Sequence, residues 1–120
     1  MYELEIKEEL DKILEKLARK NPRQLEMINK KVHEMRTSPR HVYKFLHSPL
    51  QGFNRVHIDT HFVLIFKIDH VRKTVVLYYF DHHDTIYKWK PKKWKNIHTL
   101  EPSEKAGNKP NEMVLYFDNL

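Results

Sequence analysis

Apolar residues recur with a period of two between residues 55 and 68, and this pattern restricts the fold more than any other feature. A slip of one residue in the strand register would turn every side chain to the opposite face of a sheet. Ile58 must therefore pair with Phe62 across a three-residue turn, Asp59-Thr60-His61. The apolar face of these two strands then consists of Val56, Ile58, Phe62, Leu64 and Phe66. A third strand is expected at residues 74–80, which are rich in β-branched and aromatic residues, so the region forms an antiparallel meander.

The chain before the meander has a helical period. Residues 2–6 suit a short strand, and apolar residues then recur every three or four positions in two series separated by Asn21 and Pro22. Asn21 suits a helix N-cap, Pro22 the first helical position, and Gln24 the third position of a capping box. Two helices are expected to cover the apolar sheet face with Leu10, Leu14, Leu17, Leu25, Ile28 and Val32. One strand, two helices and a meander predict an α+β fold.

Composition sets limits on the class of protein. The chain has 120 residues, no cysteine and a net charge of +6. We expect a basic cytoplasmic domain without disulfides or a membrane span. Its charge suits an anionic partner, and the alternative is an ordinary lysine-rich soluble surface. There is no glycine-rich phosphate loop and no G-x-S-x-G motif, so we expect no small-molecule cofactor. Residues 1–90 are expected to form the domain, and residues 91–120 a basic extension with one more strand at 113–117.

Arg55, His57 and Lys67 fall on the sheet face opposite the apolar residues. This face is a plausible cradle for an RNA backbone, because phosphate contacts are made largely by cationic side chains. The alternative is an ordinary solvated face of an antiparallel sheet.

The stretch DHHDTIY, at 81–87, contains groups suited to acid–base chemistry on a phosphodiester. Cleavage by attack of the 2′-hydroxyl needs a base, an acid and a cation, and His82 and His83 can fill such roles. Asp84 can orient a histidine, and Tyr87 can assist. The alternatives are structural: a backbone-bonded strand end, a turn cap and a packed tyrosine. A metal site is the less favoured interpretation, because neighbouring residues of an extended segment point to opposite sides.

The next stretch, KWKPKKWK at 88–95, is basic and aromatic. Its lysines suit RNA phosphates, and Trp89 and Trp94 can stack on bases. The alternative is a solvated linker whose tryptophans pack on the domain. The RNA-binding candidates in this stretch are Lys88, Trp89, Lys90, Lys92 and Lys93.

Two motifs together resemble the RelE/ParE toxin superfamily, over about residues 2–88. LHSPLQGFNRVHI, at 46–58, is similar to the leucine, glycine and basic residues that lead into the family's second strand. VVLYYFDHHDTIY, at 75–87, resembles the closing family segment: a strand, Gly-His-Arg, two variable residues, an aliphatic residue and Tyr. The matching positions are Arg55, His57, His82, His83 (a family arginine) and Tyr87. The chain departs from the family pattern at Val63 (often arginine) and at Asp81 (usually glycine).

The resemblance implies a toxin of a type II toxin–antitoxin module. Its partners would be an acidic antitoxin, the ribosome and mRNA. The RelE branch cuts mRNA in the ribosomal A site without metal, with His82, His83, Asp84 and Tyr87 here as the catalytic candidates. The ParE branch has the same fold, acts on DNA gyrase and has no nuclease site. The alternative function is therefore a non-catalytic binding module.

Overall fold

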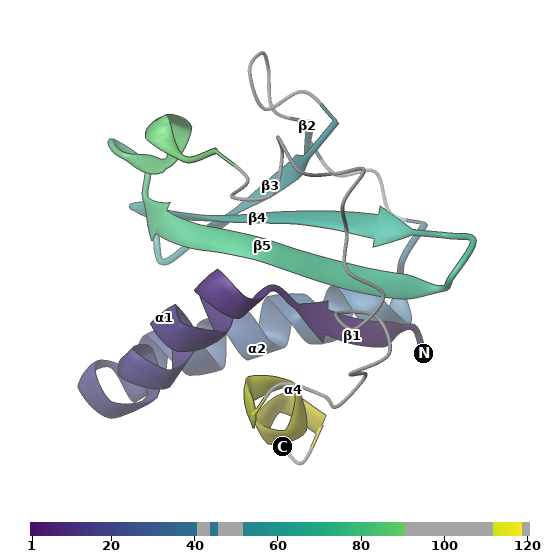
Figure 1. Cartoon of the computed structure of the whole chain (residues 1–120), viewed down its shortest axis with the longest axis horizontal. Coiled ribbons are helices and arrows are strands. Elements are labelled where there is room, and N and C mark those ends of the chain that lie inside the picture. Colours follow the sequence, from purple (N-terminus) through teal and green to yellow (C-terminus); the bar gives the residue numbers. More distant parts are fainter. Residues whose placement is uncertain (41–43, 46–51, 91–111, 119–120) are drawn as a thin grey trace.

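The strands of the protein form one five-stranded sheet, in the order β1-β5-β4-β3-β2 (Figure 1). The computed structural model describes residues 1–40, 44–45, 52–90 and 112–118. The strands are β1 Glu3–Ile6, β2 Lys44–Phe45, β3 Asn54–Ile58, β4 Phe62–Asp69 and β5 Thr74–His82. β1 runs parallel to β5, and the other pairings are antiparallel. The predicted α+β order of strand, two helices and meander is confirmed.

Helices α1 (Glu8–Lys20) and α2 (Pro22–Thr37) cover one face of this sheet (Figure 1). Their junction lies at the predicted residue, where the Asn21 side chain accepts the backbone N–H of Gln24 at 3.2 Å. The Gln24 side chain donates to Asp59 Oδ2 at 3.5 Å, in the turn between β3 and β4. The start of α2 is thus linked to the turn that sets the register of the meander.

The predicted register of β3 and β4 is confirmed. Ile58 pairs with Phe62, and the turn contains Asp59 and Thr60, whose φ angles are 49° and 63°. All five predicted strand residues pack on the helices, with Val56 and Phe62 at the margin. The predicted helix residues share this first core, and among them only Leu17 is partly exposed. Burial of each large apolar side chain contributes about 1.5–3 kcal/mol, so this face dominates the stability of the fold.

A β-bulge interrupts the pairing of β4 with β5. Ile65 pairs with Tyr79 but Phe66 pairs with Leu77, so Tyr78 is an extra residue on β5. Tyr78 and Tyr79 both pack on the face away from the helices, whereas Leu77 and Phe80 on either side of them face the helices. The bulge therefore shifts the alternation of β5 by one residue.

The second sheet face carries an apolar cluster at its centre, which corrects the prediction of a cationic or solvated face. This second core consists of Phe53, Val63, Ile65, Ile86 and Trp89, with Tyr78 and Tyr79 packed against it. Val63 and Ile65 are fully buried. Arg55 and Lys67 are half-buried and His57 is exposed, so the cations lie around this cluster.

Two predicted segments differ in the structure. The strand predicted at 113–117 is wrong: Glu112–Asp118 form helix α4, which packs on α1 and β1 (Figure 1). Met113, Val114 and Phe117 are buried, a spacing of one and three that fits a helix. The predicted loop at 38–52 contains β2, which pairs with β3. Among the described helices, none is both long enough and apolar enough to span a membrane.

Candidate functional site

The end of β5 turns sharply back toward the start of β4. The backbone N–H and the hydroxyl of Thr85 both donate to the carbonyl of His82, at 3.0 and 3.2 Å. The N–H of His83 donates to the carbonyl of His61 at 2.8 Å. These bonds fix His82, the last residue of β5, and His83, which follows it, beside a third histidine from the turn that precedes β4.

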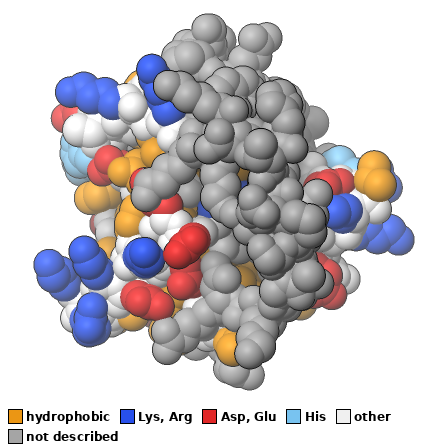
Figure 2. Space-filling view, in the orientation of Figure 1, with side chains coloured by type: hydrophobic (Ala, Val, Ile, Leu, Met, Phe, Trp, Pro, Cys, Tyr) orange, Lys and Arg blue, Asp and Glu red, His pale blue; other side chains and the backbone are white. Residues whose placement is uncertain are grey.

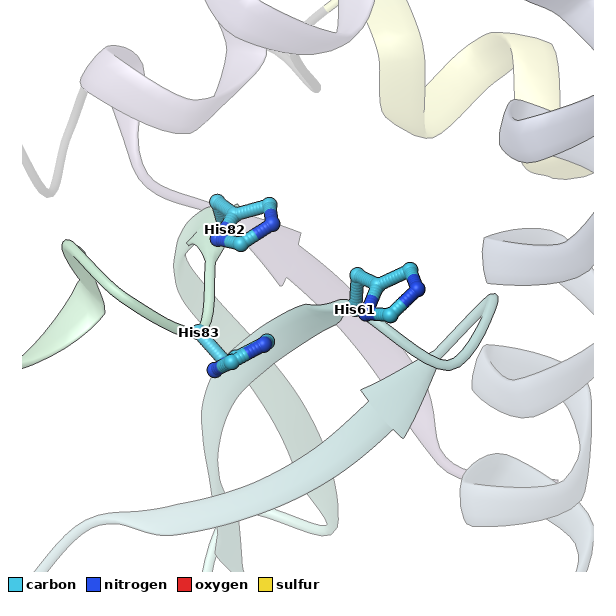
Figure 3. A group of neighbouring side chains, drawn as sticks. All are labelled: His61, His82 and His83. Carbon is cyan, nitrogen blue, oxygen red and sulfur yellow. The ribbon is translucent and has the colours of Figure 1, made fainter.

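His61, His82 and His83 form one cluster (Figure 3). The rings of His82 and His83 are stacked with their centroids 4.6 Å apart, and the ring of His61 lies 6.0 and 5.8 Å from them. The prediction that the two neighbouring histidines point to opposite sides is wrong, because β5 ends at His82 and the alternation of a strand ends with it.

Asp84 lies against the imidazoles of both His82 and His83. Its carboxylate oxygens are 3.4 Å from Nδ1 of His82 and 3.1 Å from Nδ1 of His83. Its backbone N–H donates to Nδ1 of His82 at 3.1 Å. The predicted role of Asp84, to orient a histidine, stays a prediction, and this geometry is compatible with it.

The Asp81 side chain accepts hydrogen bonds from the backbone and from a tyrosine of the second core. Its carboxylate accepts the N–H of His82 at 2.8 Å and the hydroxyl of Tyr79 at 3.4 Å. Burial raises the pKa of the Tyr79 hydroxyl, and the nearby charges of Asp81 and Glu9 raise it further. Tyr79 therefore stays protonated and donates to Asp81 at neutral pH.

Tyr87 lies one turn beyond the histidines, on a short 3₁₀ helix, η1 (Ile86–Lys88). Ile86 is fully buried in the second core, which fixes this turn. The side chain of Tyr87 is 52% exposed, so its hydroxyl is available to solvent and to a ligand. Lys88 and Lys90 beside it are also exposed. Figure 2 shows Lys, Arg and His side chains gathered at the upper left, where Figure 1 places η1 and the end of β5.

Arg55 and His57 lie on a different side of the sheet from His82. Paired residues on neighbouring strands point to the same face, and His57 is in register with Val63 and Asp81. His82 is in register with Phe62, whose ring it meets edge-on at 5.4 Å. The predicted site residues thus form two groups, one at the end of β5 and one on the second face.

Two predicted RNA-binding residues are engaged in the second core. Trp89 is 8% exposed, stacks on Tyr79 with centroids 5.4 Å apart, and donates its Nε1–H to Glu9 at 3.0 Å. The alternative interpretation of packing on the domain therefore describes Trp89, and its ring is not free to stack on a base. The Lys67 ammonium lies 4.2 Å from the centre of the Phe53 ring. Lys92, Lys93 and Trp94 lie outside the described residues.

The family follows from comparison with known proteins. No family model matches the chain. A protein of Methanocaldococcus jannaschii named "Putative toxin RelE4" is 52% identical over 90 residues, which cover 75% of this chain and 95% of that protein. The chain belongs to the RelE-like toxin family.

Solved structures agree with the RelE-like fold. The metal-bound toxin from Helicobacter pylori has a TM-score of 0.60 and 22% identity, over 72% of this chain and 99% of that one. The toxin–antitoxin complex RelBE2 from Mycobacterium tuberculosis has a TM-score of 0.53 and 26% identity, over 68% of this chain and 98% of that one.

In this RelE-like chain, His61 is the residue that sequence reasoning missed. The sequence assigns it only to the turn that joins β3 and β4. The pairing of Phe62 with His82 would have placed it beside His83. That pairing depends on the bulge at Tyr78, which the pattern of apolar residues does not reveal.

Proposed function

We propose that this chain is the toxin of a type II toxin–antitoxin system and that it cleaves mRNA at the ribosome by acid–base chemistry without metal. The observation that supports this most directly is the cluster of His82, His83 and Asp84 at the end of β5. Tyr87 is exposed on the turn that follows. Two neighbouring imidazoles supply an acid and a base for the same phosphodiester, and the phenol of Tyr87 follows them on the next turn.

In the proposed reaction, one imidazole takes the proton of the 2′-hydroxyl while the O2′–P bond forms. The other imidazole gives a proton to O5′ while the O5′–P bond breaks, so the number of protons on the pair is unchanged. Asp84 stabilises whichever ring is charged, because its two oxygens lie near Nδ1 of both. Tyr87 donates a hydrogen bond to the phosphate or assists the base.

The RNA-binding surface in this proposal extends from η1 around the second face. Lys88 and Lys90 are exposed beside Tyr87, and Arg55, His57 and Lys67 lie around the second core. A flexible single strand can follow this path around the sheet edge, with phosphate contacts made by the cations. Lys92 and Lys93 continue the basic sequence. Trp89 is buried in the second core beneath this surface and does not stack on bases.

The proposed antitoxin is acidic and covers the basic face, including Arg55 and the 82–87 edge. The net charge of +6 favours such a partner, and the similar Mycobacterium tuberculosis structure is a toxin–antitoxin complex. The proposed place of action is the cytoplasm, where ribosomes and mRNA are found. Co-expression with the neighbouring small reading frame should restore the growth of cells that produce the chain.

The proposal is tested by mapping mRNA ends on stalled ribosomes with purified chain. His83→Ala and Tyr87→Phe should each lower cleavage by about 10²–10⁴, the usual effect of removing one acid or base. His57→Ala should lower it less, since Arg55 stays in place to hold phosphate. EDTA should not lower the rate. Full cleavage by both the His83→Ala and the Tyr87→Phe chains would show that the site lies elsewhere.

A non-catalytic, ParE-like or degenerate binding module is the second candidate function. Two observations favour it: Val63, at a family arginine position, is fully buried, and Arg55 lies on a different face from His82. A cation for the transition state must then come from a histidine or a lysine. Growth arrest with intact mRNA, together with inhibition of gyrase by the purified chain, would establish this second function.

A further inference from the structure

The histidine cluster also has the composition of a metal site. One ring nitrogen of each of His61, His82 and His83 lies within 4.8 Å of the others. Imidazole is a preferred ligand of Zn²⁺, Cu²⁺ and Ni²⁺, and three imidazoles with one open position are an established zinc arrangement. The acid–base mechanism proposed above uses His82 and His83 but has no task for His61, so the third histidine requires a separate explanation.

The three histidine rings need to move only a short distance toward one another to bind one metal ion. Zinc–nitrogen bonds of about 2.0–2.1 Å in a tetrahedron place the ligand nitrogens about 3.3 Å apart. The nitrogens must therefore approach one another by at most about 1.5 Å, a movement that side-chain rotation provides. His61 and His83 are exposed and His82 is half-buried, so their rings are free to make this movement.

The backbone around the cluster is held in place before any ion binds. The N–H of His83 donates to the carbonyl of His61, which joins the two turns that carry the ligands. Asp84 lies 3.1 Å from Nδ1 of His83. A carboxylate in this position accepts the proton of one ring nitrogen and leaves the other nitrogen with its lone pair, the usual support of a zinc-bound histidine.

We propose that His61, His82 and His83 bind a divalent transition-metal ion such as Zn²⁺, and that the bound ion inhibits the chain. The inhibitory part rests on the proposed function. A metal ion bound to His82 and His83 occupies the lone pairs that accept a proton and prevents both rings from acting as acid and base. Metal availability would then control the toxin at the same residues that perform its chemistry.

Binding is measured by calorimetry with Zn²⁺ on the full-length chain without a polyhistidine tag. One Zn²⁺ per chain is expected. His61→Ala should weaken binding by about tenfold or more, because the loss even of an outer partner of a metal site costs about 10–100-fold. His33→Ala, which removes an exposed histidine from α2, is the matched control and should bind normally. Mg²⁺, which prefers oxygen ligands, should not bind here. Equal affinity in the wild-type and His61→Ala chains would refute the site.

Inhibition is measured separately, with ribosome-bound mRNA as substrate. Zn²⁺ should inhibit the wild-type and His33→Ala chains, and EDTA should restore them. His61→Ala should cleave at the wild-type rate without Zn²⁺ and resist inhibition at the same Zn²⁺ concentration. Stimulation of the wild type by Zn²⁺ would overturn the inhibitory role. Zinc binding without any cleavage would leave the metal site standing and refute both inhibition and the proposed nuclease. Cleavage without zinc binding would support the proposed nuclease and refute both the metal site and the inhibition.

Discussion

At the scale of single residues, Trp89 shows how one side chain can decide between two interpretations of a sequence. The basic and aromatic residues of KWKPKKWK suit an exposed RNA-binding arm and, equally, a solvated linker whose tryptophans pack on the domain. The structure places the indole against Tyr79 and Phe53 and gives its N–H to Glu9. The lysines beside it are thereby held at the surface next to Tyr87.

Removal of this indole should destabilise the fold. Trp89→Ala is expected to lower the free energy of unfolding by about 3–5 kcal/mol, the usual cost for a buried tryptophan. Trp89→Phe should lose less, about 1.5–3 kcal/mol, because it keeps an aromatic ring and loses mainly the hydrogen bond to the carboxylate of Glu9. Urea unfolding followed by circular dichroism measures both. An unchanged unfolding midpoint in the Trp89→Ala chain, together with weaker RNA binding, would support the base-stacking role instead.

At the scale of elements, α4 completes the first core from the far end of the chain. Its buried residues, Met113, Val114 and Phe117, pack with those of α1 and β1, and the N–H of Met113 donates to Asp11 at 3.2 Å. The relative from Methanocaldococcus jannaschii is matched by 75% of this chain, so a quarter of the chain has no counterpart in that match.

The buried face of α4 should contribute measurably to stability. Phe117→Ala is expected to lower the free energy of unfolding by about 3–5 kcal/mol, since it leaves a cavity in the core. Tyr116→Ala is the matched control, because Tyr116 is adjacent, aromatic and 40% exposed. Its effect should be smaller, about 0.5–1.5 kcal/mol, the usual contribution of an aromatic pair, because its ring meets Phe117 edge-on at 5.8 Å. Equal losses from the two substitutions, measured by urea unfolding, would mean that α4 does not pack through this face.

Local signals explain which elements could be predicted from the sequence. The N-cap at Asn21 and the pairing of Ile58 with Phe62 depend on neighbouring residues, and both are as predicted. The stretch MVLYF is a short apolar run that suits a strand or a helix equally, and only its packing on α1 decides. β2 has two residues and β1 pairs with a strand about 70 positions away, so neither pairing has a local sequence signal.

For the site, residue types could be predicted but not their directions. The sequence predicts acid–base residues at the end of β5, because histidine and aspartate directly follow an apolar strand. The bulge in β5 places His82 on a different face from Arg55 and His57. The end of β5 at His82 then brings His83 close to His61. These are properties of strand pairing, which single-sequence periodicity does not specify.

At the scale of the whole molecule, charge couples stability to pH. Arg72, in the turn between β4 and β5, contacts Asp69 at 2.8 Å and Glu5 of β1 at 3.2 Å. Hydrogen bonds from the backbone and side chain of Arg72 lower the pKa of Asp69 below its ordinary 3.8. Burial raises the pKa of Glu5, but the hydrogen bonds and charges of Lys7 and Arg72 outweigh burial and bring it below its ordinary 4.5.

Both carboxyl groups bind protons more weakly in the folded chain than in the unfolded chain. Their contribution to stability is therefore complete above about pH 4.5 and is lost as pH falls through their lowered pKa values. We expect the urea midpoint to fall below pH 4.5, and Arg72→Ala to reduce this fall. Arg19→Ala, which removes an equal charge from an exposed site on α1, should keep the pH dependence of the wild type. The same pH profile in both variants would exclude Arg72 as its source.

The extra residue at Tyr78 has a consequence for how this site can change in evolution. Because the bulge shifts the phase of β5 by one position, it decides that His82, and not Asp81, points toward Phe62 and His61. A deletion of Tyr78 would remove the bulge but keep both flanking registers, Leu77 with Phe66 and Tyr79 with Ile65, so His82 would keep its direction. The site therefore tolerates a homologue with one residue fewer here, whereas a strand of the same length that paired without a bulge would turn Asp81, and not His82, toward Phe62.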